Sequence, residues 1–298
     1  MRYGLAQEAA GLVPTNEVLV PGVLTFDAYK TRMATWDEVR KCIGLWGQFW
    51  EGASALLYPP AWLNEAESRK TNDTGPYYMG IDSGEGGDDS SWAIINRSGL
   101  KRLVSKSTPD TTVIPSTTIQ LMTEYGIKPE HVVFDAGGGG KQHADWLRSR
   151  GMKVRTVRFG ESVSLDPKRG LQQVEKRMDT KEDKYTYVNR RAEMAHELSQ
   201  LIDPTNEQPF ALPKNLGKNN YGEEYSERLR KQMSMIPNNT DAEGRFILPP
   251  KRQKPGSKNK DEVTLCSIIG YSPNEWDALM CAGHAMLHQL KKILLGAG

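Results

Sequence analysis

The 298-residue sequence lacks the features that mark membrane proteins, secreted disulfide proteins and cysteine-based zinc modules. No run of 18 apolar residues occurs, and the N-terminus has no apolar signal core, so neither a membrane span nor a secretory leader is expected. Cysteine is scarce. Cys42, Cys266 and Cys281 lie far apart and form no CxxC pair, which argues against a disulfide framework and a zinc site. We therefore expect a soluble, intracellular protein.

A strong net charge is also missing. The formal charge is +2 at pH 7, and the chain is 38% hydrophobic and 26% charged, which is typical of soluble globular domains. Its length allows one large domain or two modest ones. Bulk charge does not indicate nucleic-acid binding, but the tract at 251–260 holds five cations in ten residues. We interpret it either as a solvated loop or as an arm that contacts DNA phosphates and binds less well in salt.

The chain changes character at the turn-forming cluster 72–76. Residues 1–75 contain helix-like segments and form a mostly helical N-terminal extension. From residue 77 onward, short apolar runs alternate with helical patterns. We therefore divide the chain into an extension, 1–75, and a second domain, 76–298.

The pattern of apolar and polar residues in 76–298 predicts an α/β domain. Three antiparallel strands come first, then a strand–helix–strand unit, then further helices. The expected elements are strands at 77–82, 91–96, 101–106, 131–135, 154–159 and 246–249, and helices at 116–125, 141–150, 189–202, 223–235 and 273–294. This order favours an RNase H-like mixed sheet, an antiparallel meander followed by parallel strands, flanked by helices.

Three aspartates occupy positions suited to metal-dependent phosphodiester cleavage. Asp82 and Asp135 each end an apolar run expected to be a buried strand, and Asp277 lies in the first turn of the last helix. A carboxylate at the end of a buried strand is costly unless a cation or a donor meets it. Three such groups, if they converge, make an oxygen site for Mg²⁺ or Mn²⁺. Two such ions can cut a phosphodiester bond.

Each strand-end aspartate also has a plainer interpretation. Asp82 can cap the turn that follows it, and the glycines at 84, 86 and 87 fit either a close ligand or an ordinary hairpin loop. Asp89, in the same loop, is a second-tier ligand candidate beside its usual role as a turn former.

Four glycines at 137–140 follow Asp135 and lead into a helix. Unhindered backbone amides at a helix N-terminus bind anions, although a flexible turn would use the same residues. Because four glycines cost conformational entropy, we favour the functional interpretation. Lys141 comes next and is either a phosphate contact or an ordinary surface lysine.

The last helix has a well-defined start. Ser272 is expected to be its N-cap, with Pro273 in the first position and Glu275 completing a capping box. Asp277 then lies one turn in, where a carboxylate also compensates the helix dipole. Further along, His284 and His288 are four residues apart, the spacing of a metal pair. No glutamate follows His284, so we interpret both as packed or surface histidines.

Five stretches match, in order, the C-terminal nuclease domain of the phage large terminase family, the DNA-packaging motor protein. They are 79–82 with its glycine-rich loop to 89, 133–139 with 146–147 and 151, 189–194, 244–249, and 272–279. Residues from about 77 to 298 therefore resemble that domain. The segment 39–49 resembles the part of the family's motor domain that leads into the nuclease.

The resemblance implies an RNase H-like endonuclease that cuts concatemeric genome DNA. It implies two Mg²⁺ or Mn²⁺ ions held by Asp82, Asp135 and Asp277. The implied partners are double-stranded DNA, the terminase ATPase or motor part, the small terminase subunit and the portal, in the host cytoplasm at the procapsid, with no membrane. The candidate DNA contacts are Lys141, Lys251, Arg252, Lys254 and Lys258.

One motif of the whole packaging enzyme is missing. No G-x-x-x-x-G-K-[ST] phosphate loop for ATP occurs, so translocation by this chain alone is not expected. It is either a nuclease fragment or half of a split packaging enzyme, and the sequence leaves both open.

Three other functions fit part of the pattern. Another RNase H-like nuclease, such as a Holliday-junction resolvase or a transposase, would use the same acids. An actin-like or sugar-kinase ATPase has two Asp-x-Gly loops, as at 82–84 and 135–137. A non-catalytic DNA-binding or docking module is the third. The acid on the late helix favours the nuclease.

Overall fold

The computed structural model describes residues 7–12, 25–35, 45, 56–84, 87–163, 187–206, 209–241, 245–253 and 262–295, the last seven as backbone only. The chain forms two compact units. The smaller contains Met1–Ala53 and Lys176–Asp183, and the larger contains Ser54–Glu175 and Lys184–Gly298.

The described part of the smaller unit is largely helical. Its main element is α2 (Phe26–Thr35), where Phe26 and Tyr29 pack against Leu45 in a small apolar cluster. Apart from Leu45, the segment 39–49 lies outside the described residues. Its assignment to the end of a motor domain stays a prediction.

The larger unit begins well before the turn cluster at 72–76. Helix α4 (Pro60–Ser68) buries Leu63 and Ala66 in the same core as the sheet. Just before it, the hydroxyl of Tyr58 donates to the Ala195 carbonyl and accepts from Trp276 Nε1, both at 3.0 Å. The division at residue 75 stays a prediction about function, while the compact unit itself starts at Ser54.

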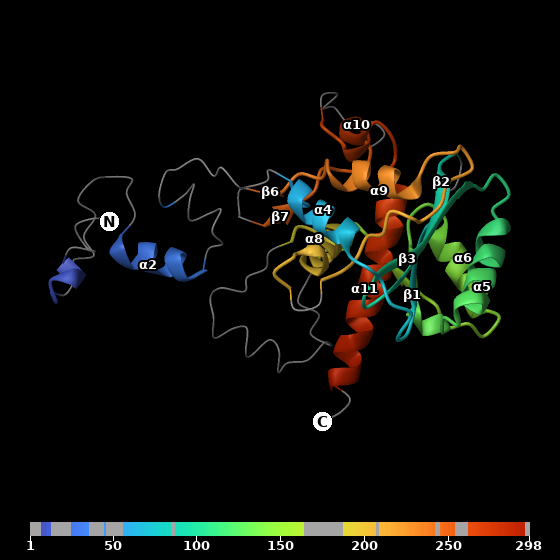
Figure 1. The fold of residues 1–298 in the computed structure, drawn as a ribbon, viewed down its shortest axis with the longest axis horizontal. Coiled ribbons are helices and arrows are strands. Elements are labelled where there is room, and N and C mark those ends of the chain that lie inside the picture. The colour runs from blue at the N-terminus through green and yellow to red at the C-terminus, as the bar shows by residue number, and fades with distance from the viewer. Residues whose placement is uncertain are drawn as a thin grey trace. The chain divides into compact units, whose positions relative to one another are not determined.

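A five-stranded mixed sheet forms the centre of the larger unit (Figure 1). Its order is β3-β2-β1-β4-β5, and the strands are β1 (Tyr78–Asp82), β2 (Asp89–Asn96), β3 (Gly99–Ser107), β4 (Val132–Asp135) and β5 (Arg155–Val157). β1, β2 and β3 pair antiparallel, whereas β1–β4 and β4–β5 pair parallel. The predicted fold class, a mixed RNase H-like sheet flanked by helices, is confirmed.

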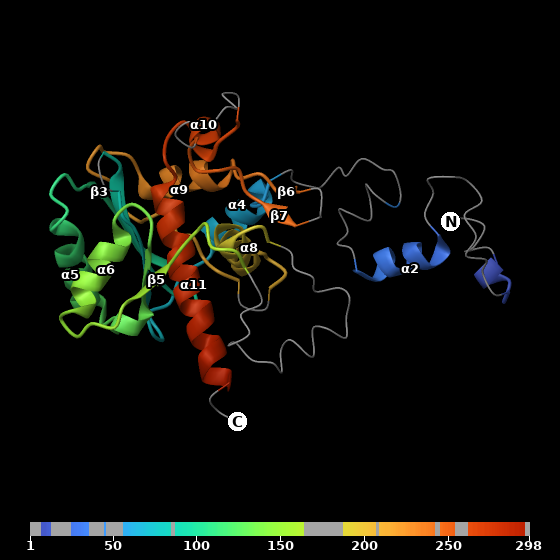
Figure 2. The same ribbon diagram turned by 180° about the vertical axis from the view of Figure 1, so that it is seen from behind.

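Helices cover both faces of this sheet (Figure 2). One face packs on α5 (Val113–Tyr125) and α6 (Gly140–Arg148). The other packs on α4, α8 (Arg190–Ile202), α9 (Tyr225–Met233) and α11 (Asn274–Leu295). Because side chains alternate along a strand, Met79 and Ile81 enter the α5–α6 core and Tyr78 enters the other.

The same alternation assigns the two strand-end acids to one face. Asp82 has the parity of Tyr78, and Asp135 has the parity of Val133, which also packs in the core on the α11 side. Both carboxylates therefore belong to the α11 face of the sheet.

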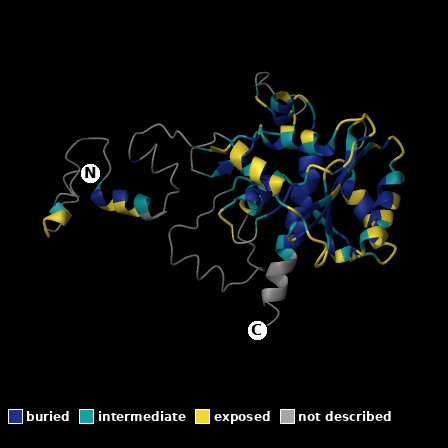
Figure 3. Cartoon of the chain, viewed as in Figure 1, coloured by how far each residue is buried: buried dark blue, intermediate teal, exposed yellow. Residues whose placement is uncertain are grey.

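Helix α11 packs directly on the centre of the sheet through Gly80. A Cβ at Gly80 would lie 2.1 Å from the Ala278 carbonyl oxygen and 2.2 Å from the Ala282 amide nitrogen. Trp276 to Met286 are buried almost throughout (Figure 3), so polar groups on this stretch need partners. Among the described residues, no helix is both long and apolar enough for a bilayer.

Some short elements differ from the sequence-based expectation. The strand expected at 154–159 is only three residues long, and the one at 246–249 is β7 (Phe246–Ile247), paired with β6 (Asn239–Thr240). Helix α10 (Leu265–Ile269) was not expected. It is too short to show a helical period, and a capping box between Thr264 and Ser267 defines its start. A 3₁₀ turn, η2 (Pro129–His131), precedes β4.

We predict that Gly80→Ala destabilises the protein. The added methyl group must push α11 away from β1, and such overpacking costs about 1–3 kcal/mol or more. Chemical denaturation followed by circular dichroism measures the loss. Gly160→Ala is the matched control, since a Cβ there meets nothing within 4 Å. Equal midpoints for the two variants would contradict the close approach described above.

Candidate functional site

Asp82 and Asp135 end neighbouring parallel strands. In the β1–β4 register, Gly80 pairs with Val133 and Ile81 with Phe134, so the two aspartates form the next level. Adjacent strands lie about 4.8 Å apart. The two carboxylates thus leave the sheet side by side, on the face that α11 covers.

The third acid joins them from α11. Lys251 Nζ lies 2.9 Å from Asp82 Oδ2 and 2.9 Å from Asp277 Oδ2. Those two oxygens are therefore no farther apart than twice that distance. The structure brings Asp82 and Asp277 together, as the metal-site prediction requires, with an ammonium group between them.

Asp135 belongs to the same electrostatic cluster. Burial raises the pKa of Asp135 to about 7, and the charge on Asp82 adds to the rise. Burial also raises the pKa of Asp82, and Asp277 adds to this, although Lys251 opposes it. Asp135 is 9% exposed, against 4% for Asp82 and 0% for Asp277. Asp135, the most accessible of the three carboxyl groups, is therefore close to half-protonated at neutral pH.

Two cations, buried Arg191 and half-buried Lys251, partly balance the three acids. Arg191, at the start of α8, donates to Asp277 Oδ1 from Nη2 at 2.7 Å and from Nε at 3.2 Å. Burial lowers the pKa of Lys251, but the charges of Asp277 and Asp82 outweigh burial and the net pKa is raised. With all three carboxylates ionised, the cluster carries one negative charge more than these two cations neutralise.

The donor set suits a hard divalent cation. It consists of carboxylate oxygens, the ligands that Mg²⁺ and Mn²⁺ prefer. Asp277 Oδ2 is buried and, among the described residues, accepts no hydrogen bond of good geometry despite its ion pair, so it retains acceptor capacity. In the described part of the chain, the three aspartates do not form a group with all ligand atoms within 4.8 Å. Lys251 Nζ lies between two of these carboxylates, 2.9 Å from Asp82 Oδ2 and 2.9 Å from Asp277 Oδ2.

The glycines after Asp135 have a steric role in this structure. A Cβ at Gly140 would lie 1.9 Å from the Asp135 carbonyl oxygen, and one at Gly138 would lie 2.6 Å from the Ser83 carbonyl oxygen. Gly138 and Gly139 also have φ of 49° and 76°, which favours glycine. The loop after β4 can thus pack on the loop after β1. Anion binding by this loop stays a prediction.

The prediction of a capping box at the start of α11 is wrong. Ser272 Oγ donates to Asn274 Oδ1 at 2.5 Å, and α11 begins at Asn274. Glu275 is fully buried, and its carboxylate accepts from Arg228 Nε at 2.7 Å and from Gln232 Nε2 at 2.6 Å. Tertiary partners on α9 have displaced the local capping interaction.

The remaining candidates have other partners, are exposed or lie outside the described residues. Asp89 Oδ1 accepts from the Tyr221 hydroxyl at 3.3 Å, and its metal role stays a prediction. Arg252 pairs with Asp88 at 2.5 Å, and Lys141 is exposed in the first turn of α6. Lys251 lies within the acidic cluster. Lys254 and Lys258 lie outside the described residues.

Sequence reasoning missed Arg191 and the contacts that Lys251 makes with Asp82 and Asp277; a role of Lys251 in DNA contact stays a prediction. Arg191 sits in the first turn of a helix whose apolar spacing was recognised, but nothing local indicates that it reaches a residue 86 positions away. Lys251 lay within a basic tract that suggested phosphate contact. Only the fold shows that it faces two carboxylates.

Comparison with known proteins gives a structural match alone. The sequence matches no protein-family model and no curated protein. The nuclease domain of the large terminase subunit gp2 of bacterial virus Sf6 matches with a TM-score of 0.53 and 22% identity, covering 77% of this chain and 98% of that domain. A lysine-to-alanine variant of that domain, with manganese and beta-thujaplicinol, gives 0.53 and 19%, covering 77% and 98%.

The chain has the fold of a phage large terminase nuclease domain. The predicted resemblance is thereby confirmed at the level of fold. At this identity the match shows the fold alone.

We predict that Asp135→Asn stabilises the metal-free protein at high pH. The folded-state pKa of Asp135 is raised to about 7, so its contribution to stability is complete below its unfolded pKa and is lost as pH rises through 7. At pH 8, with chelator, the variant should be more stable than wild type by on the order of 1–4 kcal/mol. Near pH 4 this difference should disappear.

Denaturant titrations from pH 4 to pH 8 measure this difference. Asp145→Asn is the matched control, because that aspartate pairs with Arg148 on the exposed face of α6. A stability gap for Asp135→Asn that stays constant over the whole range would contradict the raised pKa.

Proposed function

We propose that this protein is the divalent-metal-dependent endodeoxyribonuclease of a phage DNA-packaging terminase, and that it cuts concatemeric genome DNA. One observation carries the proposal: three aspartates gather on one face of a terminase nuclease fold, and one ammonium group bridges two of them. A similar domain, from Sf6, has been seen with manganese.

Asp82 would hold two Mg²⁺ or Mn²⁺ ions, with Asp135 and Asp277 each completing one coordination sphere. When bound, such a pair supplies the attacking hydroxide and stabilises the leaving 3′ oxygen of the phosphodiester. The donor oxygens and the spare acceptor capacity of Asp277 Oδ2 fit that role.

The protein's own groups prepare this site. Arg191 fixes the Asp277 carboxylate through two donors to one oxygen, which leaves the other oxygen for Lys251 or a cation. Asp135 must lose its proton before it binds metal, so metal uptake releases protons and weakens below neutral pH. Lys251 keeps two buried carboxylates together in the absence of metal.

Basic side chains would hold the DNA through its phosphates. Lys141, Arg252, Lys254 and Lys258 are the proposed phosphate contacts, with Lys251 at the cluster itself. Such contacts depend on salt and carry little sequence information. In the packaging reaction we propose that the chain works with a terminase motor part, the small subunit and the portal, in the host cytoplasm at the procapsid.

We predict that Asp135→Asn abolishes Mn²⁺-dependent nicking of supercoiled plasmid, with a loss of at least about 1,000-fold, because one metal loses its carboxylate. Gel analysis of plasmid nicking measures this. Asp145→Asn is the control and should cut like wild type. Wild-type turnover by Asp135→Asn would rule out the proposed site. A four-way junction cut far faster than linear duplex would point to a resolvase instead.

We predict that Lys251→Met destabilises the metal-free protein by up to about 3–5 kcal/mol, because the buried carboxylates of Asp82 and Asp277 lose the half-buried cation that they share. Mn²⁺ should restore much of this loss, because it replaces the missing positive charge. The rise in melting temperature with Mn²⁺ should therefore exceed that of wild type. Arg252→Met is the matched control, with an expected loss of at most about 1 kcal/mol at an exposed pair.

Thermal melts with and without Mn²⁺ decide the outcome. If Mn²⁺ raises the melting temperature of Lys251→Met and of wild type equally, Lys251 does not stand in for a cation.

A further inference from the structure

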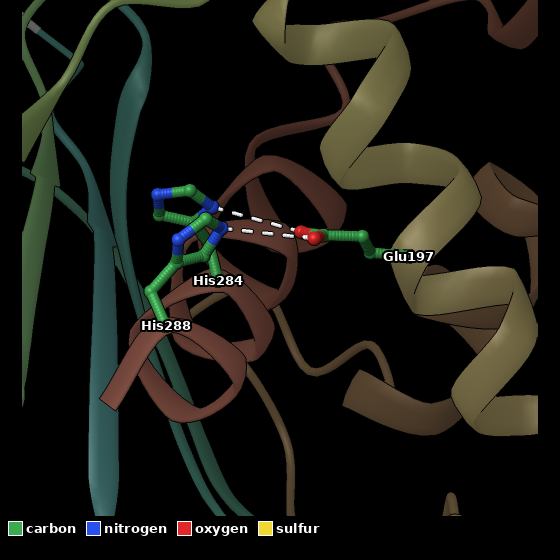
Figure 4. A group of neighbouring side chains, drawn as sticks. All are labelled: Glu197, His284 and His288. Atoms are coloured by element: carbon green, nitrogen blue, oxygen red, sulfur yellow. Dashed lines mark ion pairs between the residues drawn. The ribbon is translucent and has the colours of Figure 1, made fainter. Parts of the chain in front are cut away.

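A second group of metal-binding residue types lies apart from the aspartates. His284 and His288 project from α11 toward Glu197 on α8 (Figure 4). One ligand atom from each residue can be chosen so that all three lie within 4.8 Å of one another. Among the described residues it is the one group of three or more such side chains that meets this limit.

The distances within this group fit coordination better than hydrogen bonding. His284 Nδ1 lies 3.6 Å from Glu197 Oε2, and His288 Nε2 lies 3.6 Å from Glu197 Oε1. Nitrogen–oxygen hydrogen bonds are usually shorter than about 3.2 Å. Two ligands of one tetrahedral zinc ion, each about 2.0–2.1 Å from the metal, lie about 3.4 Å apart.

Both imidazole nitrogens that face Glu197 are buried, and within the described part of the chain neither forms a hydrogen bond. The ring centroids of the two histidines lie 3.8 Å apart. Two imidazolium ions at that separation would repel each other. The arrangement therefore suits neutral rings that present lone pairs.

The protonation states agree with this geometry. Burial lowers the pKa of His284 to about 4, although Glu197 opposes the change. Burial raises the pKa of Glu197, but its contacts with His284 and His288 outweigh burial and lower it overall. At neutral pH the group offers a neutral imidazole and an ionised carboxylate, the states that bind metals.

We propose that Glu197, His284 and His288 form a second metal site that takes a borderline transition ion such as Zn²⁺ and clamps α8 to α11. Two imidazoles and a carboxylate are the donor set of three-ligand zinc sites, in which water fills the remaining position. Imidazole nitrogen favours Zn²⁺ over Mg²⁺, whereas the aspartate cluster offers only oxygen. One chain thus carries two sites of different selectivity.

The proposed clamp lies along the same pair of helices as the acidic cluster. Arg191 and Glu197 are six residues apart on α8, and their partners Asp277 and His284 are seven apart on α11. At 1.5 Å per residue, the two levels are about 10 Å apart. A metal at the second level would fix the position of α8 and hold Arg191 against Asp277.

Zinc titration of the purified chain tests the proposal. Asp135→Asn protein in excess Mg²⁺ removes the contribution of the aspartate cluster, and isothermal calorimetry then measures Zn²⁺ binding. We expect one equivalent at micromolar affinity or tighter, and Glu197→Gln in that background should weaken it by at least about 100-fold. Glu193→Gln, on the same helix and paired with Arg190, is the matched control and should bind Zn²⁺ normally.

Two further measurements keep the test decisive. If Glu197→Gln fails to fold by circular dichroism, His288→Gln should lose Zn²⁺ binding in its place. Co²⁺ bound to otherwise wild-type protein in excess Mg²⁺ should show the strong visible absorption of a four-coordinate site. Absence of stoichiometric Zn²⁺ binding, or equal binding by Glu197→Gln and Glu193→Gln, would overturn the proposal. Because calorimetry does not depend on DNA cleavage, failure here is separate from failure of the nuclease.

Discussion

The close approach of α11 to β1 is the constraint on which the rest of the structure depends. It requires residue 80 to lack a side chain, because the helix backbone occupies the space that a Cβ would need. This contact places the first turn of α11 beside the ends of β1 and β4. Asp277 can then meet two carboxylates that strand pairing has already placed side by side. An acidic cluster assembled from distant segments thus rests on one backbone-to-backbone contact.

Burial of like charges is the second governing effect. Three carboxylates share a site in which Lys251 and Arg191 supply the nearest positive charge. Burial raises the pKa of Asp135, the most exposed member, and the negative charge of Asp82 adds to the rise. A divalent cation would stabilise this buried, negatively charged site more than it would stabilise a neutral or solvent-exposed site. Burial has removed the water that would otherwise stabilise the carboxylates. Stability and the proposed metal binding are therefore linked through the same side chains.

Much of this could be predicted because it is local. Asp82 and Asp135 follow apolar runs, and alternation along a strand assigns both to one face. The steric need for Gly80, the bridging position of Lys251 and the reach of Arg191 are not local, because each depends on segments distant in sequence. Glu275 shows that a local pattern can also mislead. Its position predicts a capping box, but its carboxylate instead accepts hydrogen bonds from Arg228 and Gln232 on α9. No sequence pattern singled out Glu197 as a candidate ligand, because its histidine partners lie on another helix.

The paired levels between α8 and α11 have a thermodynamic consequence. Arg191 and Glu197 belong to one rigid helix, as do Asp277 and His284, so a slide or rotation that loosens one level also disturbs the other. Ligands that bind at two such levels cannot act independently. If a ligand bound at one level raises the affinity of a second ligand at the other level, the second ligand raises the affinity of the first by the same factor.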